Sequence, residues 1–336
     1  MNSAPSPGYE RMTVAFVTGV TGQDGSYLVD RLLADGVKVH GLVHQGDDLP
    51  PQVHDALPQF ELHDGDLTDG QRLSAIVREV APNEIYNLAG MSSVALSWRE
   101  PALTGVVNGV AVAHLLEAAW QLQESRGRRV SFVQASSAEI FGQPTTSPQD
   151  EFTAIAPTNP YGAAKAYGHH MAGIYRTRGL AASSCILFNH ESPRRPPTFV
   201  TRKITQAAAR IARDGGGKMK LGNLEARRDW GWAPDYVDAL VRASRYESGD
   251  DFVIATGRTH SVAEFAAAAL SHVGIADWEK WVETDPQFVR PVDATELVGD
   301  ASKARHHLGW QSTVDFAGLV GAMVDHDLAL VAASEN

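Results

Sequence analysis

The sequence contains a single cysteine among 336 residues, so no disulfide can form within the chain. Cys185 stands in the apolar run SSCILF, which favours a small buried side chain in a strand over a reactive thiol. Chains that rely on no disulfide are typical of a reducing compartment, so we expect a cytoplasmic protein.

Basic residues and long apolar runs are also scarce. Lys and Arg number 29 against 40 Asp and Glu, the net charge is −11, and no run of Lys or Arg exceeds two. Because nucleic-acid binding needs a basic patch, we expect no nucleic-acid partner. Nowhere do about eighteen apolar residues run together, and the first residues, MNSAPSPGYERM, lack an apolar segment behind a basic start. We therefore expect no membrane span, and a disordered tail over residues 1–12 rather than a signal peptide.

The chain is instead rich in short apolar runs that alternate with helical patterns. Hydrophobic residues make up 43% of the sequence, enough for a large core. The runs predicted to be strands are TVAFVT, VKVHGLV, FELHDGDL, EIYNLAG, VSFVQASS and SSCILFN, and the helices expected between them cover 27–34, 73–80, 106–120 and 161–178. Apolar strands separated by helices indicate an α/β fold with a doubly wound parallel sheet covered on both faces.

The character of the sequence changes after Asn189. HESPRRPPTFVTRK is rich in proline and arginine, and a strand pattern returns only at DFVIATG. We predict a larger domain over residues 13–188 and a smaller C-terminal lobe over 189–336, interleaved with the last elements of the sheet.

Glycines are concentrated at the first strand-to-helix turn. VTGVTGQDG places Gly19, Gly22 and Gly25 three residues apart. Glycines there let the chain turn tightly and let a pyrophosphate approach the N–H groups at a helix N-terminus. The alternative is an ordinary glycine-containing turn, but the strand–turn–helix context favours a dinucleotide cofactor.

Two further segments carry groups suited to proton transfer. In NPYGAAK, Tyr161 and Lys165 are four residues apart and share one helix face. An ammonium near the phenol lowers its pKa, which would make Tyr161 a usable base near neutral pH; the alternative is a solvated pair on a helix surface. In QASSAEIFG, Ser137 and Glu139 follow a buried strand. There the carboxylate could equally be a loop residue or a helix cap.

Together, the glycine turn, the serines after the fifth strand and the Tyr-x-x-x-Lys pair resemble the extended short-chain dehydrogenase/reductase superfamily, whose fold is of the Rossmann type. Within it, the sequence is most similar to the GDP-mannose 4,6-dehydratases. The segments that carry this likeness are TGVTGQDGSYL, GDL, LFNHESPRR, TFVTRKIT, RDWGWAPDYV, FVRP and LGW. The resemblance runs from about Val14 to Trp310.

The resemblance implies a hydro-lyase that uses a bound nicotinamide as a temporary hydride store. Tyr161 would remove the O4 proton while a hydride leaves C4, and Glu139 would take the C5 proton of the 4-keto sugar. Water would leave from C6, and the hydride would return there. This reaction explains a carboxylate beside Ser137, which occupies the position where the family usually has threonine. An epimerase or reductase needs no such carboxylate.

The resemblance also assigns binding residues. Those implied for the cofactor are Gly19, Gly22, Gln23, Asp24, Gly25, Asp66, Leu67, Lys165, His190 and Arg195. Those implied for a nucleotide-sugar substrate, GDP-mannose, are Asn189, Lys203, Arg228 and Arg290. The family further implies a homodimer or a homotetramer.

Two segments depart from the family's pattern. His44 and Gln45 replace the arginine pair that usually grips the NADP 2′-phosphate, so the cofactor is NADP or NAD. Ser93 stands where the family commonly has histidine, a change that bears on contacts with the sugar.

Other functions are less well supported by the sequence. The adjacent pairs His169-His170 and His306-His307 point in different directions on a helix, so we expect no metal site. Trp230 and Trp232 fit a packing role. A related GDP-sugar epimerase or reductase stays the alternative enzyme. A catalytically silent NAD(P)-sensing protein is the alternative of another class, and it would be expected to have lost Ser137, Tyr161 or Lys165.

Overall fold

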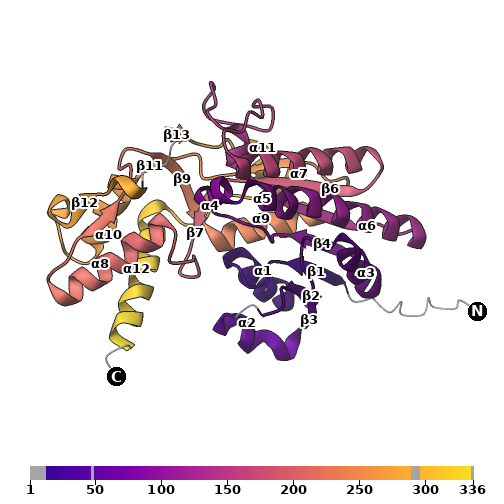
Figure 1. The fold of residues 1–336 in the computed structure, drawn as a ribbon, viewed down its shortest axis with the longest axis horizontal. Helices are drawn as coiled ribbons and strands as arrows, with labels where there is room; N and C mark the ends of the chain where they lie inside the picture. The colour runs from indigo at the N-terminus through magenta and orange to yellow at the C-terminus, as the bar shows by residue number, and fades with distance from the viewer. Residues whose placement is uncertain (1–12, 47–48, 289–295, 334–336) are drawn as a thin grey trace, which may run out of the picture.

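The computed structural model describes residues 13–46, 49–288 and 296–333. Residues 1–12, predicted to be a tail, and Arg290, predicted to bind substrate, lie outside the described residues. The described chain forms a sheet domain, which contains the indigo to magenta part of the chain in Figure 1 and some later, orange elements, with a smaller lobe beside it.

Seven parallel strands form the central sheet, in the order β10-β6-β5-β4-β1-β2-β3. They are β1 Val14–Thr18, β2 Lys38–Val43, β3 Glu61–Asp64, β4 Glu84–Asn87, β5 Ser131–Ser137, β6 Ala181–Leu187 and β10 Asp251–Ile254. The predicted doubly wound sheet is confirmed. Its strand order reverses between β1 and β4, and ligands of such sheets bind at the carboxyl ends of the strands beside this point. Cys185 is buried in β6, as expected, and burial raises the pKa of its thiol.

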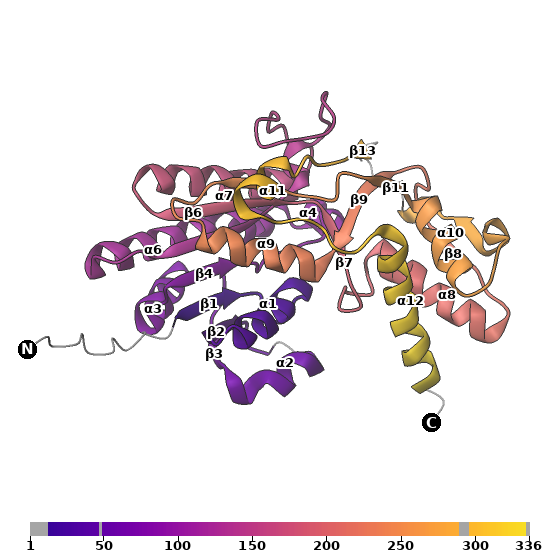
Figure 2. The same ribbon diagram turned by 180° about the vertical axis from the view of Figure 1, so that it is seen from behind.

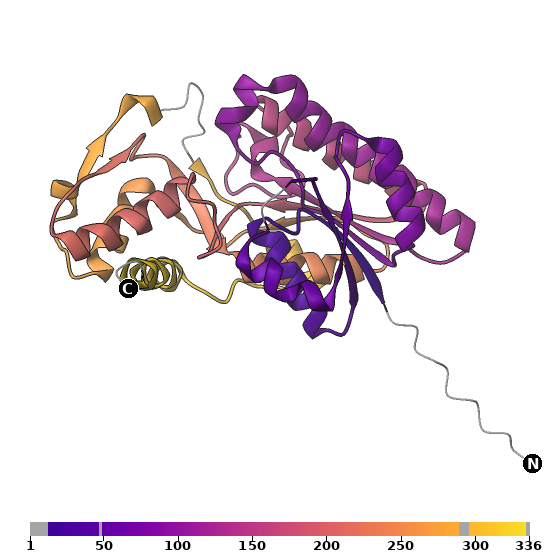
Figure 3. The same cartoon turned by 60° about the horizontal axis from the view of Figure 1, so that its bottom comes forward.

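Helices cover both faces of the sheet, as Figure 3 shows. One face packs on α1 Gln23–Ala34, α9 Ala233–Arg245 and α11 Ser302–Leu308, and the other on α3 Gly70–Val80, α6 Ala111–Arg126 and α7 Pro160–Thr177. Figure 2 shows α1 and α9 side by side. Shorter elements connect these layers: α2 Pro51–Ala56, η1 Leu57–Gln59, α4 Val94–Arg99, α5 Pro101–Gly105, the π-helical turn η2 Val106–Val110 and η3 Ala138–Phe141. Because apolar side chains point from both faces of the inner strands, the core of the sheet domain consists of two layers.

The smaller lobe has its own core. Its elements are β7 Asn189–Glu191, α8 Val200–Asp214, β8 Met219–Leu221, β9 Arg227–Trp232, β11 Thr259–Ser261, α10 Val262–His272, η4 Trp278–Trp281, β12 Val282–Thr284, η5 Pro286–Phe288, β13 Glu296–Leu297 and α12 Phe316–Ala333. Trp230 packs edge-on against Phe265 at a centroid distance of 5.2 Å, in the packing role expected of it. Between β9 and β11 the chain returns to the sheet as α9 and β10. The division between residues 188 and 189 stays a prediction.

Two helical segments are long and apolar enough to cross a membrane by length and composition alone, 101–126 and 316–333. Half of the most apolar stretch of the first segment is buried within the protein. In the second segment a third of that stretch is buried. Helices of a protein core pass the same test, so the expected absence of a membrane span stays a prediction.

Candidate active site

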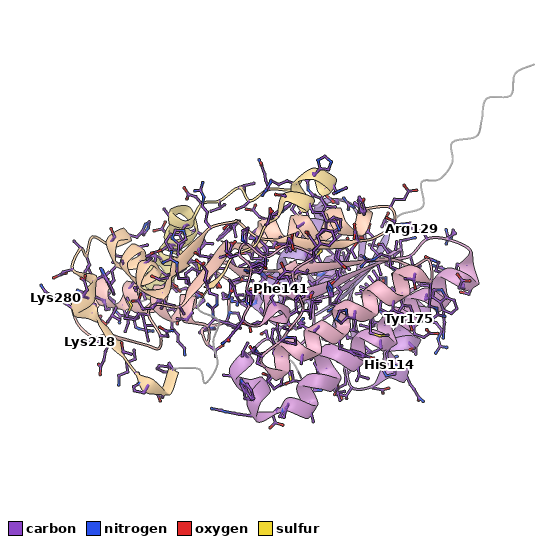
Figure 4. The ribbon with its side chains drawn as sticks, turned by 90° about the horizontal axis from the view of Figure 1, so that it is seen from above. His114, Arg129, Phe141, Tyr175, Lys218 and Lys280 are labelled. Atoms are coloured by element: carbon purple, nitrogen blue, oxygen red, sulfur yellow. The ribbon has the colours of Figure 1, made fainter. Side chains whose placement is uncertain are left out.

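A cavity of about 370 Å³ lies where the carboxyl ends of the strands meet the smaller lobe. Figure 4 labels Phe141, at the end of η3, near the middle of the molecule, with Lys218 and Lys280 at the far end of the lobe. The predicted site residues that line the cavity are Asp24, Ser137, Glu139, Tyr161, Lys165, Asn189, His190, Arg195, Lys203 and Arg228. Residues spread over two hundred positions of sequence are thus brought to one place.

The glycine turn borders this cavity without lining it. Gly19 has φ +77°, and a Cβ there would lie 2.8 Å from the backbone nitrogen of Ala89. A Cβ on Gly25 would lie 2.0 Å from the carbonyl oxygen of Gly19. Helix α1 begins after Gly22 with no side-chain cap. The close packing requires glycine, and the bare helix start suits the phosphates of a dinucleotide.

Asp24 and His190 form a buried link between the first turn of α1 and β7. His190 Nε2 lies 2.8 Å from Asp24 Oδ2, and its Nδ1 lies 2.7 Å from the carbonyl oxygen of Phe188. Gln23 joins the link, because its Nε2 donates to the His190 carbonyl at 3.1 Å. Burial alone would lower the pKa of His190 and raise that of Asp24, but their mutual attraction outweighs it. The pKa of His190 is therefore raised and that of Asp24 lowered.

Tyr161 and Lys165 lie on one face of α7, as predicted, but their electrostatics differ from the prediction. Burial raises the pKa of Tyr161 to about 12, although contact with the Ser137 hydroxyl opposes the rise. Lys165 Nζ donates to the carbonyl oxygen of Ala135 at 2.9 Å and lies 5.8 Å from the centre of the Tyr161 ring. The expectation that Lys165 brings this phenol to a pKa near neutrality is wrong here, because desolvation dominates. Burial also lowers the pKa of Lys165 to about 8.

Glu139 reaches the same cavity from η3, immediately after β5. Its Oε2 accepts a hydrogen bond of 2.8 Å from Asn159 Nδ2. Asn159 also caps α7, because its Oδ1 accepts from the backbone N–H of Gly162 at 2.8 Å. A Cβ on Gly162 would lie 2.4 Å from the carbonyl oxygen of Glu139, so glycine allows η3 to approach the helix this closely.

Asn159 is the functional residue that the sequence reasoning missed. An asparagine before Pro-Tyr at a helix start is a recognisable N-cap. Nothing in the sequence, however, shows that its amide reaches Glu139, which lies twenty residues earlier.

The predicted substrate residues approach the cavity from the lobe side. Asn189 begins β7, and Lys203 lies on α8 with its Nζ 4.5 Å from the ring centre of Phe288. Arg228 is buried in β9, where its Nη1 donates to the carbonyl oxygen of Arg227 at 2.7 Å. Two cationic side chains that line the same cavity suit a diphosphate.

Asp66 and Leu67 lie away from the cavity at this edge of the sheet, whereas Arg195 lines it. Asp66 and Leu67 follow β3, and Asp66 Oδ2 lies 3.4 Å from His44 Nε2. Arg195 lines the cavity and packs on the ring of Phe199 at 3.8 Å. The buried Ser136 hydroxyl lines the cavity and makes no hydrogen bond within the described residues. This unpaired hydroxyl and the close glycine turn fit a dinucleotide lying along the carboxyl ends of the strands.

A family model for GDP-mannose 4,6 dehydratase matches residues 16–323 of the chain. GDP-mannose 4,6 dehydratase 1 of Arabidopsis thaliana is 44% identical over 329 residues, which cover 94% of this chain and 90% of that protein. The GDP-mannose 4,6 dehydratase of Homo sapiens is 40% identical over 352 residues, with coverage of 96% and 93%.

Solved structures share the fold. The UDP-glucose 4-epimerase of Thermus thermophilus, in complex with NAD, superposes with a TM-score of 0.81 at 27% identity, covering 94% of this chain and 99% of that one. The Pseudomonas aeruginosa protein RMD, complexed with NADPH, gives a TM-score of 0.76 at 22% identity, with coverage of 95% and 100%. The NAD-bound epimerase supports a nicotinamide cofactor, and the choice between NAD and NADP stays a prediction.

Proposed function

Because the chain belongs to the GDP-mannose 4,6-dehydratase family, we propose that it converts GDP-mannose to GDP-4-keto-6-deoxy-mannose. The sugar is oxidised at C4, loses water across C5 and C6, and is reduced at C6, so that one water is lost without net oxidation. A bound nicotinamide supplies the temporary store for the hydride that leaves C4 and returns to C6.

In this proposal Tyr161 takes the O4 proton, and the Ser137 hydroxyl hydrogen-bonds the reacting oxygens. A phenol with a pKa of about 12 is protonated at neutral pH, so its ionised form needs support. Lys165, with a pKa of about 8, carries positive charge at neutral pH in the same cavity and supplies that support.

The observation that carries the proposal is the carboxylate of Glu139, held by Asn159 in the cavity that Tyr161 also lines. Once C4 is a ketone, the C5 proton is acidic and Glu139 removes it. The same group then gives this proton to the departing C6 hydroxyl, which leaves as water. When the hydride returns to C6, a proton is added at C5, in balance with the one that Tyr161 removed from O4.

The substitution Glu139→Gln tests this role. Glutamine keeps an oxygen that can accept from Asn159 but has no basicity. General acid–base groups typically contribute about a hundredfold to ten-thousandfold in rate, so we expect at least about a hundredfold loss of the 4-keto-6-deoxy product, measured by mass spectrometry. Oxidation at C4, followed through the absorbance of the reduced nicotinamide, should still occur.

Tyr161→Phe is the matched control, because it should abolish both signals. If Glu139→Gln makes product at a near wild-type rate, Glu139 is only a loop residue. Dehydration would then depend on another acid–base group, whereas a wild-type enzyme that forms no 4-keto-6-deoxy product would give way to an epimerase or reductase.

We further propose that the enzyme accepts NAD more readily than NADP-selective relatives do. His44, which replaces half of the usual arginine pair, lies beside the carboxylate of Asp66. Each lost charge-assisted contact to a 2′-phosphate costs about 1.5–3 kcal/mol, roughly one to two decades in affinity. Titration with both cofactors should give an NADP preference below about a thousandfold, and His44→Arg should increase it. A larger wild-type preference would mean that another basic residue binds the phosphate.

We predict that the protein assembles as a homo-oligomer and that it lies in the cytoplasm. Apolar side chains exposed on α4, α5, η2 and α7 support the first: Leu96, Trp98, Leu103, Val110, Tyr167 and Ile174. Such a concentration is typical of a surface that another subunit covers.

A further inference from the structure

Away from the cavity, three side chains with metal-binding atoms meet at the edge of the sheet. His40 of β2 pairs in register with Glu61 of β3, and His63 follows two residues later on the same face. His40 Nδ1 lies 2.9 Å from His63 Nε2 and 3.6 Å from Glu61 Oε2. All three ligand atoms lie within 4.8 Å of one another, and no other such group of three occurs among the described residues.

We propose that His40, Glu61 and His63 bind a divalent transition metal, with Zn²⁺ as the fitting ion. Two imidazole nitrogens and one carboxylate oxygen are a ligand set that Zn²⁺ favours, with a fourth position left for water. Ligand atoms bound at about 2.0–2.1 Å in a tetrahedron lie about 3.4 Å apart. The distances of 2.9 and 3.6 Å lie on either side of that value, so small side-chain shifts admit the ion.

The surroundings hold the ligands in place. His40 is buried and His63 half-buried, while Glu61 is exposed and leaves a path from solvent. Lys38 Nζ binds Glu61 Oε1 at 2.8 Å, which fixes the carboxylate and leaves Oε2 towards His40. The positive charge of Lys38 opposes a bound cation, whereas the negative charge of Glu79 on α3 favours positive charge at His40.

The position of the site indicates a structural role. It joins the edge strand β3 to β2 and does not line the cavity. His44 and Asp66 follow these same strands at their carboxyl ends, on the side predicted to bind the cofactor. A metal that bridges the strands therefore stabilises the edge of the sheet and takes no part in the reaction of the sugar.

The test uses the full chain, freed of metal by a chelator and then titrated with Zn²⁺. Binding only to the native state raises the melting temperature with metal concentration. Co²⁺ as a second probe should give visible absorption bands from nitrogen and oxygen ligands. We expect His63→Gln to weaken Zn²⁺ binding at least tenfold and Glu61→Gln, at an exposed position, to weaken it measurably.

His54→Gln is the matched control, because His54 is an exposed histidine 3.9 Å from the carboxylate of Asp55. It should bind Zn²⁺ as the wild type does. Equal affinity in the wild type and in His63→Gln would overturn the proposal, as would failure of the wild type to bind. In either case the two histidines would share only a hydrogen bond. Circular dichroism without metal establishes that each variant is folded.

Discussion

At the scale of single residues, Asp24 and His190 show how burial and charge compete. Both ring nitrogens of His190 face oxygen acceptors, the Phe188 carbonyl and the Asp24 carboxylate, so the doubly protonated ring suits them best. The ring also stacks on Tyr236, with 4.5 Å between centroids. An ion pair at this point ties β7 to the start of α1, and with it the lobe to the glycine turn.

This pair predicts a pH dependence of stability. Because the pKa of folded His190 is raised above its ordinary 6.5, its contribution is complete below pH 6.5 and is lost as pH rises through the folded pKa. Because the pKa of Asp24 is lowered from 3.8, its contribution is present above pH 3.8 and is lost as pH falls through the lower value. The pair therefore stabilises most between these limits.

Asp24→Asn should thus reduce the free energy of unfolding most near pH 5.5, measured by urea denaturation without added cofactor. The difference from the wild type should shrink on going to about pH 9. A difference that grows as pH rises would contradict the raised pKa of His190.

At the scale of secondary-structure elements, the start of α7 does two things. Asn159 caps the helix that carries Tyr161 and Lys165, and it donates to Glu139 on η3. The cap orients the helix and the amide orients the carboxylate, so one residue sets the spacing between the two groups proposed to transfer protons.

Separating these effects is possible because aspartate also caps helices. Asn159→Asp keeps an oxygen for the Gly162 N–H but places a second carboxylate beside Glu139, which disfavours the ionised form of Glu139. For Asn159→Asp we expect a free energy of unfolding close to that of the wild type and a kcat at least tenfold lower. The acid limb of the profile of kcat against pH should move to higher pH.

Asn159→Ala provides the contrast, since it loses the cap as well and should cost about 0.5–2 kcal/mol of stability. An Asn159→Asp enzyme with the wild-type pH profile would show that the contact with Glu139 has no positioning role.

At the scale of the whole molecule, the cavity exists only because the two parts of the chain close on each other. The sheet domain supplies Ser137, Glu139, Tyr161 and Lys165. The lobe supplies Lys203 and Arg228, which we predict to bind the diphosphate. In the proposed function, the groups for the chemistry and those for recognition of the nucleotide therefore come from different parts of the fold.

This division predicts that nucleotide preference can be measured without turnover. Isothermal titration with GDP, UDP and dTDP should give the tightest binding for GDP, as the family membership leads us to expect. Lys203→Ala should weaken all three by roughly one decade, the size of one charge-assisted contact. Equal or tighter binding of UDP would place the enzyme among dehydratases of another nucleotide sugar.

The sequence by itself determined the doubly wound sheet, the glycine turn and the Tyr161–Lys165 face, because each follows from local periodicity and short spacing. It also indicated the family. Tertiary structure alone decided the pKa of Tyr161, since desolvation depends on everything packed around the ring. It likewise decided the bond from Asn159 to Glu139 and the meeting of His40, Glu61 and His63, which require separate segments to pack together or strands to pair in register. Interactions between residues far apart in the chain leave no periodic pattern in the sequence, so these contacts could be identified only from the tertiary structure.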